Sequence, residues 1–403
     1  MIKTGDQPQF QQNKSRTLNL EMAVADFVYL DFQASTPVCE EAWEAMQPYF
    51  QREFSNPHST QHLGGISSSQ AIENARSQVA KLINADTSEM VFTSGATEAN
   101  NLVFLGLLDE LRGKRILVSA IEHKSVLAPA EHLGRYGIEV ELIPVTGDGM
   151  VDVETLETMM GDDVGLVSIM MANNEVGSVN PIKDCVEIVR KYGAYFHTDA
   201  AQAPLTGEVD VLSLDVDFLS LSSHKIYGPK GVGALYVSNF VQDKLQPILF
   251  GGGQERGWRP GTLPTALCVG FGAAAQTLQN NKRDIWGEIR GFRDYFWEKL
   301  RDSSVDTVLI GPDFNTRHVG NLNVCFIGMD AEELLLVLQQ DVAASTGSAC
   351  NSGLVASSHV LSALHLNDAF AKGCIRFSFG LGLTYEDLDV AVLKVMRSVM
   401  LLS

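Results

Sequence analysis

Short apolar segments alternate with segments of helical periodicity along the chain from about residue 27 onward. The apolar segments are expected to form strands, and they read VYLDF, EMVFTS, KRILVSA, EVELIPV, GLVSIMMA, AYFHTDA, DFLSLSSH and GALYVS. Helical periodicity predicts helices between them, over residues 69–83, 127–136 and 182–192. Strands that are apolar on both faces and alternate with helices indicate an α/β fold with a mostly parallel sheet, covered by helices on both sides.

The pattern changes after about residue 275. A long amphipathic helix is expected over residues 276–303, and strand-like segments NLNVCFI and CIRFSFG follow it. These elements predict a second, smaller α+β domain. We expect a large domain over residues 36–282, and a small domain formed by residues 1–35 together with 283–403.

The amino-acid composition of the chain excludes several classes of function. The chain has 403 residues, with 30 Lys and Arg against 49 Asp and Glu, which gives a net charge of −19. Such an acidic chain is not expected to bind nucleic acid or anionic membranes directly. No apolar run is long enough to span a bilayer, and the first 25 residues lack the apolar stretch of a secretory signal, so we expect a cytoplasmic protein. In that compartment the six cysteines are expected to be free thiols; they are Cys39, Cys185, Cys268, Cys325, Cys350 and Cys374.

A lysine follows one of the predicted strands in the segment SLSSHKIYGPKGVGALYV. The strand delivers Ser222, Ser223, His224 and Lys225 to its end, and glycines then allow a tight turn. A single lysine in such a place is usually a surface residue. A lysine at a buried strand end can instead form a Schiff base, and the flanking serines, histidine and glycines favour that interpretation here.

Two further strand ends carry polar residues that suit a phosphorylated pyridine ring. Asp199 follows the strand in YFHTDAAQ, where it can pair with a protonated pyridine nitrogen, and Gln202 can reach a phenolic oxygen. Thr97 lies in VFTSGATEANN, at an expected helix N-terminus that attracts phosphate. Taken singly, Asp199 and Thr97 could each be ordinary helix caps. Together with Lys225 they point to pyridoxal 5′-phosphate, and no metal site is expected.

An ordered series of motifs extends over nearly the whole chain. It reads YLDFQASTP, NPHS, SGATEANN, EHKSVL, NNEVG, HTDAAQ, SSHKIYGPKGVGALYV, GGGQERGWRPGT, STGSACNSG and IRFSFG. With these motifs the chain resembles the cysteine desulfurases of the NifS/IscS type, which are class V aminotransferase-family enzymes, and its cysteine motif resembles group I. The resemblance implies the pyridoxal-phosphate transferase fold type I. In that fold a mostly parallel seven-stranded sheet forms the cofactor domain, and a smaller α+β domain carries the catalytic cysteine loop.

The resemblance also implies roles for residues around the cofactor ring. Lys225 would bind the cofactor as a Schiff base, and His123 in EHKSVL would stack on the ring and move protons. Asp199 would pair with the pyridine nitrogen, and Gln202 with the phenolate.

Further roles concern the phosphate group and the assembly. The expected phosphate-binding residues are Ala96, Thr97, Ser222 and His224. In this family a threonine of the neighbouring subunit completes the phosphate site, and Thr262 in RPGT matches it. The resemblance therefore implies a homodimer.

The remaining roles concern L-cysteine. Asn174 and Arg376 match the residues that bind the substrate carboxylate, for which a guanidinium offers bidentate contact. Cys350 in STGSACNSG would attack the substrate sulfur, so that it carries a persulfide while L-alanine leaves. Sulfur-acceptor proteins would then take the sulfur.

The chain departs from the family pattern at places that concern the acceptor. SNFVQDKLQP lacks the basic run that housekeeping members carry, GWRPGT replaces GMRSGT, and MRSVMLLS ends without their docking tail. The acceptor could therefore belong to iron–sulfur cluster assembly, or to a dedicated thiolation pathway such as DNA phosphorothioation or tRNA thiolation.

Other functions are also compatible with parts of the pattern. Within the enzyme class these are a selenocysteine lyase, an aminotransferase or a kynureninase-like hydrolase, although an aminotransferase needs no cysteine such as Cys350. A cofactor-less scaffold would not need Lys225, Asp199, His123 and Cys350 together. A dinucleotide-binding enzyme is disfavoured because GGGQERG lacks the G-x-G-x-x-G spacing.

Overall fold

Seven of the eight strand-like segments form one sheet. The computed structural model describes residues 27–347 and 358–403. In the sheet the strand order is β2-β8-β7-β6-β5-β3-β4, and β8 runs antiparallel to both of its neighbours while the other pairs are parallel. The predicted mostly parallel seven-stranded sheet is confirmed. The strands are β2 (Met90–Thr93), β3 (Arg115–Ser119), β4 (Glu139–Ile143), β5 (Val164–Ser168), β6 (Tyr195–Asp199), β7 (Phe218–Ser222) and β8 (Gly233–Val237).

Helices cover both faces of this sheet, as its doubly apolar strands require. One buried cluster joins the sheet to α3 and α4, and a second joins it to α2, α6 and α8. The helices of this part are α1 (Glu40–Gln51), α2 (Leu63–Leu82), α3 (Ala96–Gly106), α4 (Lys124–Leu133), α5 (Val153–Met159), α6 (Ile182–Arg190), α7 (Val211–Leu214) and α8 (Thr265–Arg301). Short 3-10 turns accompany them: η2 (Thr87–Glu89), η3 (Gly134–Tyr136), η4 (Ala203–Leu205), η5 (Ser223–Lys225) and η6 (Gln254–Gly257).

The long helix α8 starts earlier than its amphipathic pattern predicts. The prediction placed its start at residue 276, whereas the helix begins at Thr265. The first turns read ALCVGFGAAA and have no polar face, because α1 and α2 pack against them. Gly272 allows α2 to pack closely, since a Cβ there would lie 2.7 Å from the Cα of Ala75 in α2.

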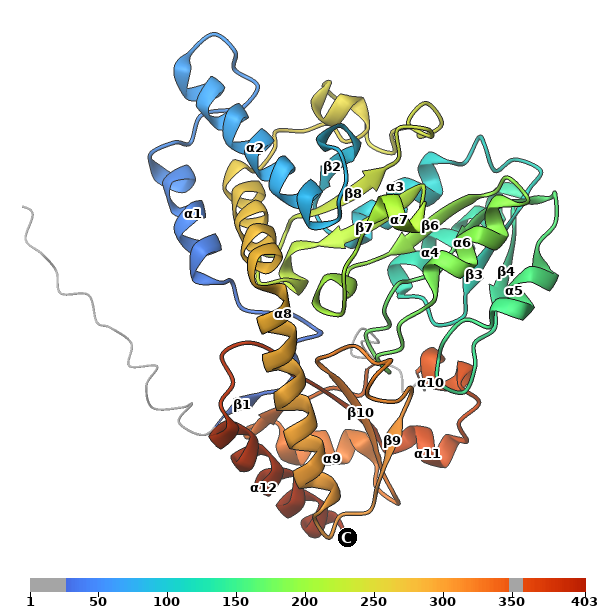
Figure 1. Cartoon of the computed structure of the whole chain (residues 1–403), viewed down its shortest axis with the longest axis vertical. Helices are drawn as coiled ribbons and strands as arrows, with labels where there is room; N and C mark the ends of the chain where they lie inside the picture. The colour runs from blue at the N-terminus through green and yellow to red at the C-terminus, as the bar shows by residue number, and fades with distance from the viewer. Residues whose placement is uncertain (1–26, 348–357) are drawn as a thin grey trace, which may run out of the picture.

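A three-stranded antiparallel sheet with the order β12-β10-β9 forms the centre of the second part of the molecule. The eighth predicted strand segment, VYLDF, contributes β1, which pairs in parallel with β11 beside this sheet. Helix α8 runs from the large sheet into this part (Figure 1), and residue 282 lies inside the helix. The exact domain boundaries at 35 and 282 stay a prediction. The elements are β1 (Val28–Tyr29), β9 (Thr307–Ile310), β10 (Asn321–Phe326), α9 (Ala331–Leu338), β11 (Val342–Ala343), α10 (His359–Ala363), α11 (Asp368–Lys372), β12 (Cys374–Ser378) and α12 (Tyr385–Leu402).

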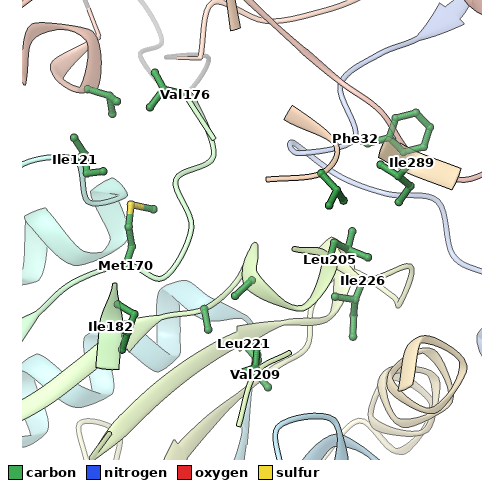
Figure 2. Close-up of a cluster of buried hydrophobic side chains, with 14 of the residues drawn as sticks. Phe32, Ile121, Met170, Val176, Ile182, Leu205, Val209, Leu221, Ile226 and Ile289 are labelled. Carbon is green, nitrogen blue, oxygen red and sulfur yellow. The ribbon is translucent and has the colours of Figure 1, made fainter. Parts of the chain in front are cut away.

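A continuous apolar core connects the two parts. Figure 2 shows a portion of it, in which Phe32 lies beside Ile289 of α8, while Leu221 of β7 lies beside Val209. Buried residues of both sheets therefore belong to one apolar cluster. Among the helices of the described ranges, none has the length and apolar character that crossing a membrane requires.

Candidate active site

A cavity of about 490 Å³ lies where the carboxyl ends of β5, β6 and β7 meet the second part of the molecule. Ligands of open α/β sheets bind at this edge of the sheet. The walls contain ten of the twelve site residues expected from the sequence. They are Ala96, Thr97, His123, Asn174, Asp199, Gln202, Ser222, His224, Lys225 and Arg376. Thr262 is exposed and is absent from these walls, and Cys350 lies outside the described residues.

Lys225 lies in the 3-10 turn η5 directly after β7. Its Nζ donates hydrogen bonds to the backbone carbonyls of Gln33, at 2.5 Å, and Ala34, at 2.9 Å. The side chain of Gln202 also donates to the Gln33 carbonyl, at 3.0 Å. The segment after β1 therefore forms one wall of the cavity and holds the amine in place.

A chain of hydrogen bonds connects Asp199 to His123. The Nδ2 of Asn100 donates to Asp199 Oδ2 at 2.8 Å and to Ser125 Oγ at 2.9 Å. Ser125 Oγ in turn lies 2.8 Å from His123 Nδ1. Asp199 is buried at the end of β6, and a buried polar group needs a hydrogen-bond partner. Asn100 supplies that partner and aligns the imidazole at the same time.

The tautomer of His123 follows from its backbone contact. Its Nδ1 accepts a hydrogen bond from the backbone N–H of Ser125 at 3.1 Å, so Nδ1 carries no proton and a neutral ring is protonated at Nε2. Burial lowers the pKa of His123 below its usual value. The ring is therefore neutral at pH 7 and Nε2 is the nitrogen that can donate.

A second histidine lies under the sheet edge. His197 in β6 is fully buried, and it contacts Ser168 Oγ at 2.8 Å and Ser220 Oγ at 3.1 Å. Burial lowers its pKa to about 4. A neutral His197 thus packs below Asp199 without adding charge to the cavity.

The end of the cavity beside α3 is suited to an anion. Thr97 lies in the first turn of α3, where backbone N–H groups have no helical acceptor. Gly233 lets strand β8 approach this turn, because a Cβ there would lie 2.7 Å from the Cα of Gly95. Ser222 and His224 line the same cavity. Burial, followed by the charges of two nearby lysines, lowers the pKa of His224 to about 4, so this ring is neutral at pH 7.

Arg376 forms the opposite wall, on strand β12 of the small sheet. Its Nη2 lies 2.5 Å from Asp31 Oδ1, and its Nη1 donates to the Asn174 carbonyl at 2.8 Å. Its Nε is buried and has no hydrogen-bond partner among the described residues. The guanidinium is therefore oriented by two groups and keeps a donor for a further acceptor.

Thr262 follows a segment that a buried ion pair holds in place. Glu255 accepts hydrogen bonds from Arg76 Nη1 and Nη2, each at 2.7 Å, and from the backbone N–H of Phe92 at 2.6 Å. Glu255 and Arg256 both have positive φ, at 47° and 58°. The chain therefore turns sharply at these two residues, and Thr262, farther along, is exposed.

The residues of the cavity fit pyridoxal 5′-phosphate as a set. An amine, a buried carboxylate, an imidazole and a helix N-terminus lie around one space of suitable size, and each matches a group of that cofactor. The unpaired donor on Arg376 lies on the opposite side, where a substrate would be held.

Comparison with known proteins identifies the family. The family model described as Aminotransferase class-V matches residues 28–390. The chain belongs to this family. It is also 42% identical over 367 residues to "Cysteine desulfurase IscS" of Rickettsia rickettsii (strain Iowa), a match that covers 91% of this chain and 89% of that protein.

Solved structures agree with this assignment. A NifS-like protein has a TM-score of 0.87 at 32% identity, over 93% of this chain and 100% of that one. "SspA in complex with cysteine" has a TM-score of 0.75 at 34% identity, over 88% and 99%. The predicted place among the cysteine desulfurases, the type I fold and the dependence on pyridoxal 5′-phosphate are confirmed.

The sequence interpretation missed residues that act through others. Asn100 and Ser125 lie within SGATEANN and EHKSVL, but neither was singled out. Asn100 is three residues after Thr97 and therefore lies on a neighbouring face of α3, a spacing that could have indicated it. Gln33 and Asp31 could not have been found, because their contacts join segments more than 190 residues apart.

Proposed function

We propose that this enzyme converts L-cysteine to L-alanine, holds the sulfur as a persulfide on Cys350 and passes it to acceptor proteins. The observation that carries the proposal is the single cavity that contains Lys225, Asp199 and Arg376. A desulfurase requires the cysteine of STGSACNSG, whereas an aminotransferase does not. The solved neighbour with bound cysteine supports the choice of substrate.

Each residue has a task in this reaction. Bound pyridoxal 5′-phosphate supplies an electron sink that stabilises negative charge on the substrate Cα. Arg376 and Asn174 would hold the substrate carboxylate, and the Lys225 amine would take the proton from Cα. His123 Nε2 would donate a proton near the ring, because its Nδ1 is already occupied by Ser125.

The sulfur step balances without an added oxidant. The Cys350 thiolate would attack the substrate Sγ, so that an S–S bond forms as the Cβ–Sγ bond breaks, and the electron pair of that bond remains with the carbon skeleton. Protonation of the carbon then gives L-alanine. An external acceptor thiolate would later attack the outer sulfur of the persulfide.

A single incubation tests the proposal. Purified protein with bound cofactor should release one alanine for each cysteine consumed, and mass spectrometry should find an added sulfur on the peptide containing Cys350.

Two variants test the roles of single residues. Cys350→Ala should bind cysteine without forming this persulfide, and Lys225→Ala should lose the absorbance of the Schiff base. Native sulfide release by Cys350→Ala would contradict the assignment of the nucleophile, and amino transfer to a keto acid would favour the aminotransferase alternative.

We further propose that the enzyme is a homodimer in which Thr262 completes the phosphate site of the neighbouring subunit. Thr262 is exposed and is absent from the walls of its own cavity. Large apolar side chains are exposed on segments that adjoin η6: Phe54 at 75%, Leu63 at 83% and Phe250 at 87%. An apolar surface of this kind is typical of a face that a partner covers.

The chemistry of a persulfide indicates what kind of protein would accept the sulfur, because its outer sulfur is transferred to a thiolate. We propose an acceptor protein with an exposed thiol, in iron–sulfur cluster assembly or in a dedicated thiolation pathway in the cytoplasm. Cross-linking of the persulfide-loaded enzyme in a cell extract, followed by identification of the captured thiol protein, separates the two pathways.

A further inference from the structure

Gln33 has an amide nitrogen without a hydrogen-bond partner. The residue is 3% exposed and lines the active-site cavity. Its Nε2 is buried and has no acceptor among the residues that the structure describes. An unpaired buried N–H group costs free energy. Because Gln33 lines the cavity, a ligand that reaches the amide from the cavity would supply the missing acceptor.

The orientation of the Gln33 amide is fixed by its neighbours. Arg317 can only donate, and its Nη1 donates to Asn321 Oδ1 at 2.8 Å. Asn321 must therefore present its Nδ2 on the other side, where it donates to Gln33 Oε1 at 2.6 Å and to the carbonyl of Glu175 at 3.0 Å. Because Oε1 of Gln33 is the acceptor in this chain, Nε2 is the end that remains unpaired.

The position of Gln33 identifies which part of a ligand it would contact. Its carbonyl accepts from Lys225 Nζ, so the residue lies beside the amine that would hold the cofactor. Its backbone N–H donates to Ser378 Oγ at 2.9 Å, two residues beyond Arg376 on β12. Asp31, two residues before Gln33, holds the Arg376 guanidinium. In an amino acid the carboxylate is attached to the carbon that carries the amine. A residue between Lys225 and Arg376 is therefore placed to contact the carboxylate.

We propose that Gln33 Nε2 donates a hydrogen bond to the carboxylate of the amino-acid substrate, next to Arg376 Nε, which also lacks a partner in the described part of the chain. The inference rests on the proposed function, in which Arg376 binds this carboxylate. Gln33 is then a residue that determines the preference for α-amino acids over simple amines. Asn321 and Arg317 act as positioning residues that hold the donor in its orientation.

Binding to the Cys350→Ala background tests this proposal without turnover. L-Cysteine and cysteamine, which has the same amine and thiol but no carboxylate, are titrated while the absorbance of the bound cofactor is followed. Gln33→Met removes the donor at similar size, and it should weaken binding of cysteine about 10-fold while cysteamine changes less than about 2-fold. Gln33→Glu keeps the acceptor for Asn321 but places a negative charge beside the carboxylate, and it should weaken cysteine about 100-fold or more.

Two controls separate the possible failures. Gln276 on α8 is exposed and also accepts a side-chain hydrogen bond, from Gln78 at 2.8 Å, so Gln276→Glu adds the same charge and should leave both dissociation constants unchanged. Arg376→Gln should weaken cysteine more than cysteamine. If Arg376→Gln does so and Gln33→Met does not, Gln33 completes a contact within the protein and the inference is wrong. If Arg376→Gln has no selective effect, the proposed carboxylate site itself is wrong.

Discussion

His123 illustrates how single residues acquire their function from neighbours that a motif does not reveal. Its ring is oriented by Ser125, which is oriented by Asn100, which also pairs the buried Asp199. The motifs predicted the two end residues of this chain but not its two middle residues. The reason is physical: the end residues are expected to contact the cofactor, whereas the middle residues act by holding the end residues in their orientation.

We expect Asn100→Leu to weaken cofactor binding. The substitution leaves the buried Asp199 without its side-chain donor and removes the contact to Ser125, and a lost hydrogen bond to a buried charge costs about 1.5–3 kcal/mol. The cofactor dissociation constant, measured by equilibrium dialysis, should rise by about 10-fold or more. Asn281→Leu on the exposed surface of α8 is the matched control, and equal cofactor affinity in the two variants would contradict the expected role of Asn100.

His197 should make stability depend on pH. Its pKa is about 4 in the folded protein and near 6.5 when unfolded, so below pH 6.5 the unfolded state binds a proton that the folded state does not. The stabilisation is complete above pH 6.5 and is lost as the pH falls to 4, by about 2 kcal/mol between pH 7 and pH 5. Urea unfolding at these two pH values should show a smaller loss for His197→Gln than for the native protein. An identical loss in both would show that His197 is not the responsible group.

At the scale of the elements, the strands of the large sheet followed their apolar pattern, whereas the start of α8 did not. The pattern of a helix reveals its buried side only when another side is polar. The first turns of α8 are enclosed by α1, α2 and the sheet, so they contain no polar stripe. Tertiary contacts keep this segment helical in spite of Gly270 and Gly272.

Two glycines of α8 should respond in opposite ways to alanine. Gly272→Ala places a methyl group 2.7 Å from the backbone of Ala75, and overpacking of this kind costs about 1–3 kcal/mol. Gly287 lies in the same helix, and a methyl group added there would meet no atom within 4 Å, so Gly287→Ala should stabilise by about 0.5–1 kcal/mol. Thermal unfolding of both variants measures the difference. A Gly272→Ala protein as stable as the native one would mean that the α2–α8 crossing can separate without cost.

At the scale of the whole molecule, the cavity forms only where two sheets meet. The large sheet supplies the residues expected to bind the cofactor, and the small sheet supplies Arg376. The segment from Asp31 to Ala34 joins both, through its contacts with Arg376 and Lys225. In the proposed dimer, a third part would add a residue to the site, namely Thr262 of the second copy.

Mixing inactive variants tests that contribution. Lys225→Ala and Thr262→Ala subunits, unfolded together and refolded, should form heterodimers with one intact site, which carries Lys225 from one copy and Thr262 from the other. Random pairing of the two subunits should then recover about a quarter of the native activity. Light scattering should give a mass of twice 43.9 kDa. If Thr262 acts within its own chain, mixing recovers no activity.

The sequence by itself determined the strand-and-helix alternation, the family, the cofactor and ten residues that line the cavity. These properties depend on local apolar pattern and on residues of distinctive chemistry within short motifs. The tertiary structure decided the start of α8, the pairing of Asp199 by Asn100, and the position of Gln33 between Lys225 and Arg376. Those features arise from contacts between distant segments, where the residue types are common and only the three-dimensional arrangement gives them a partner.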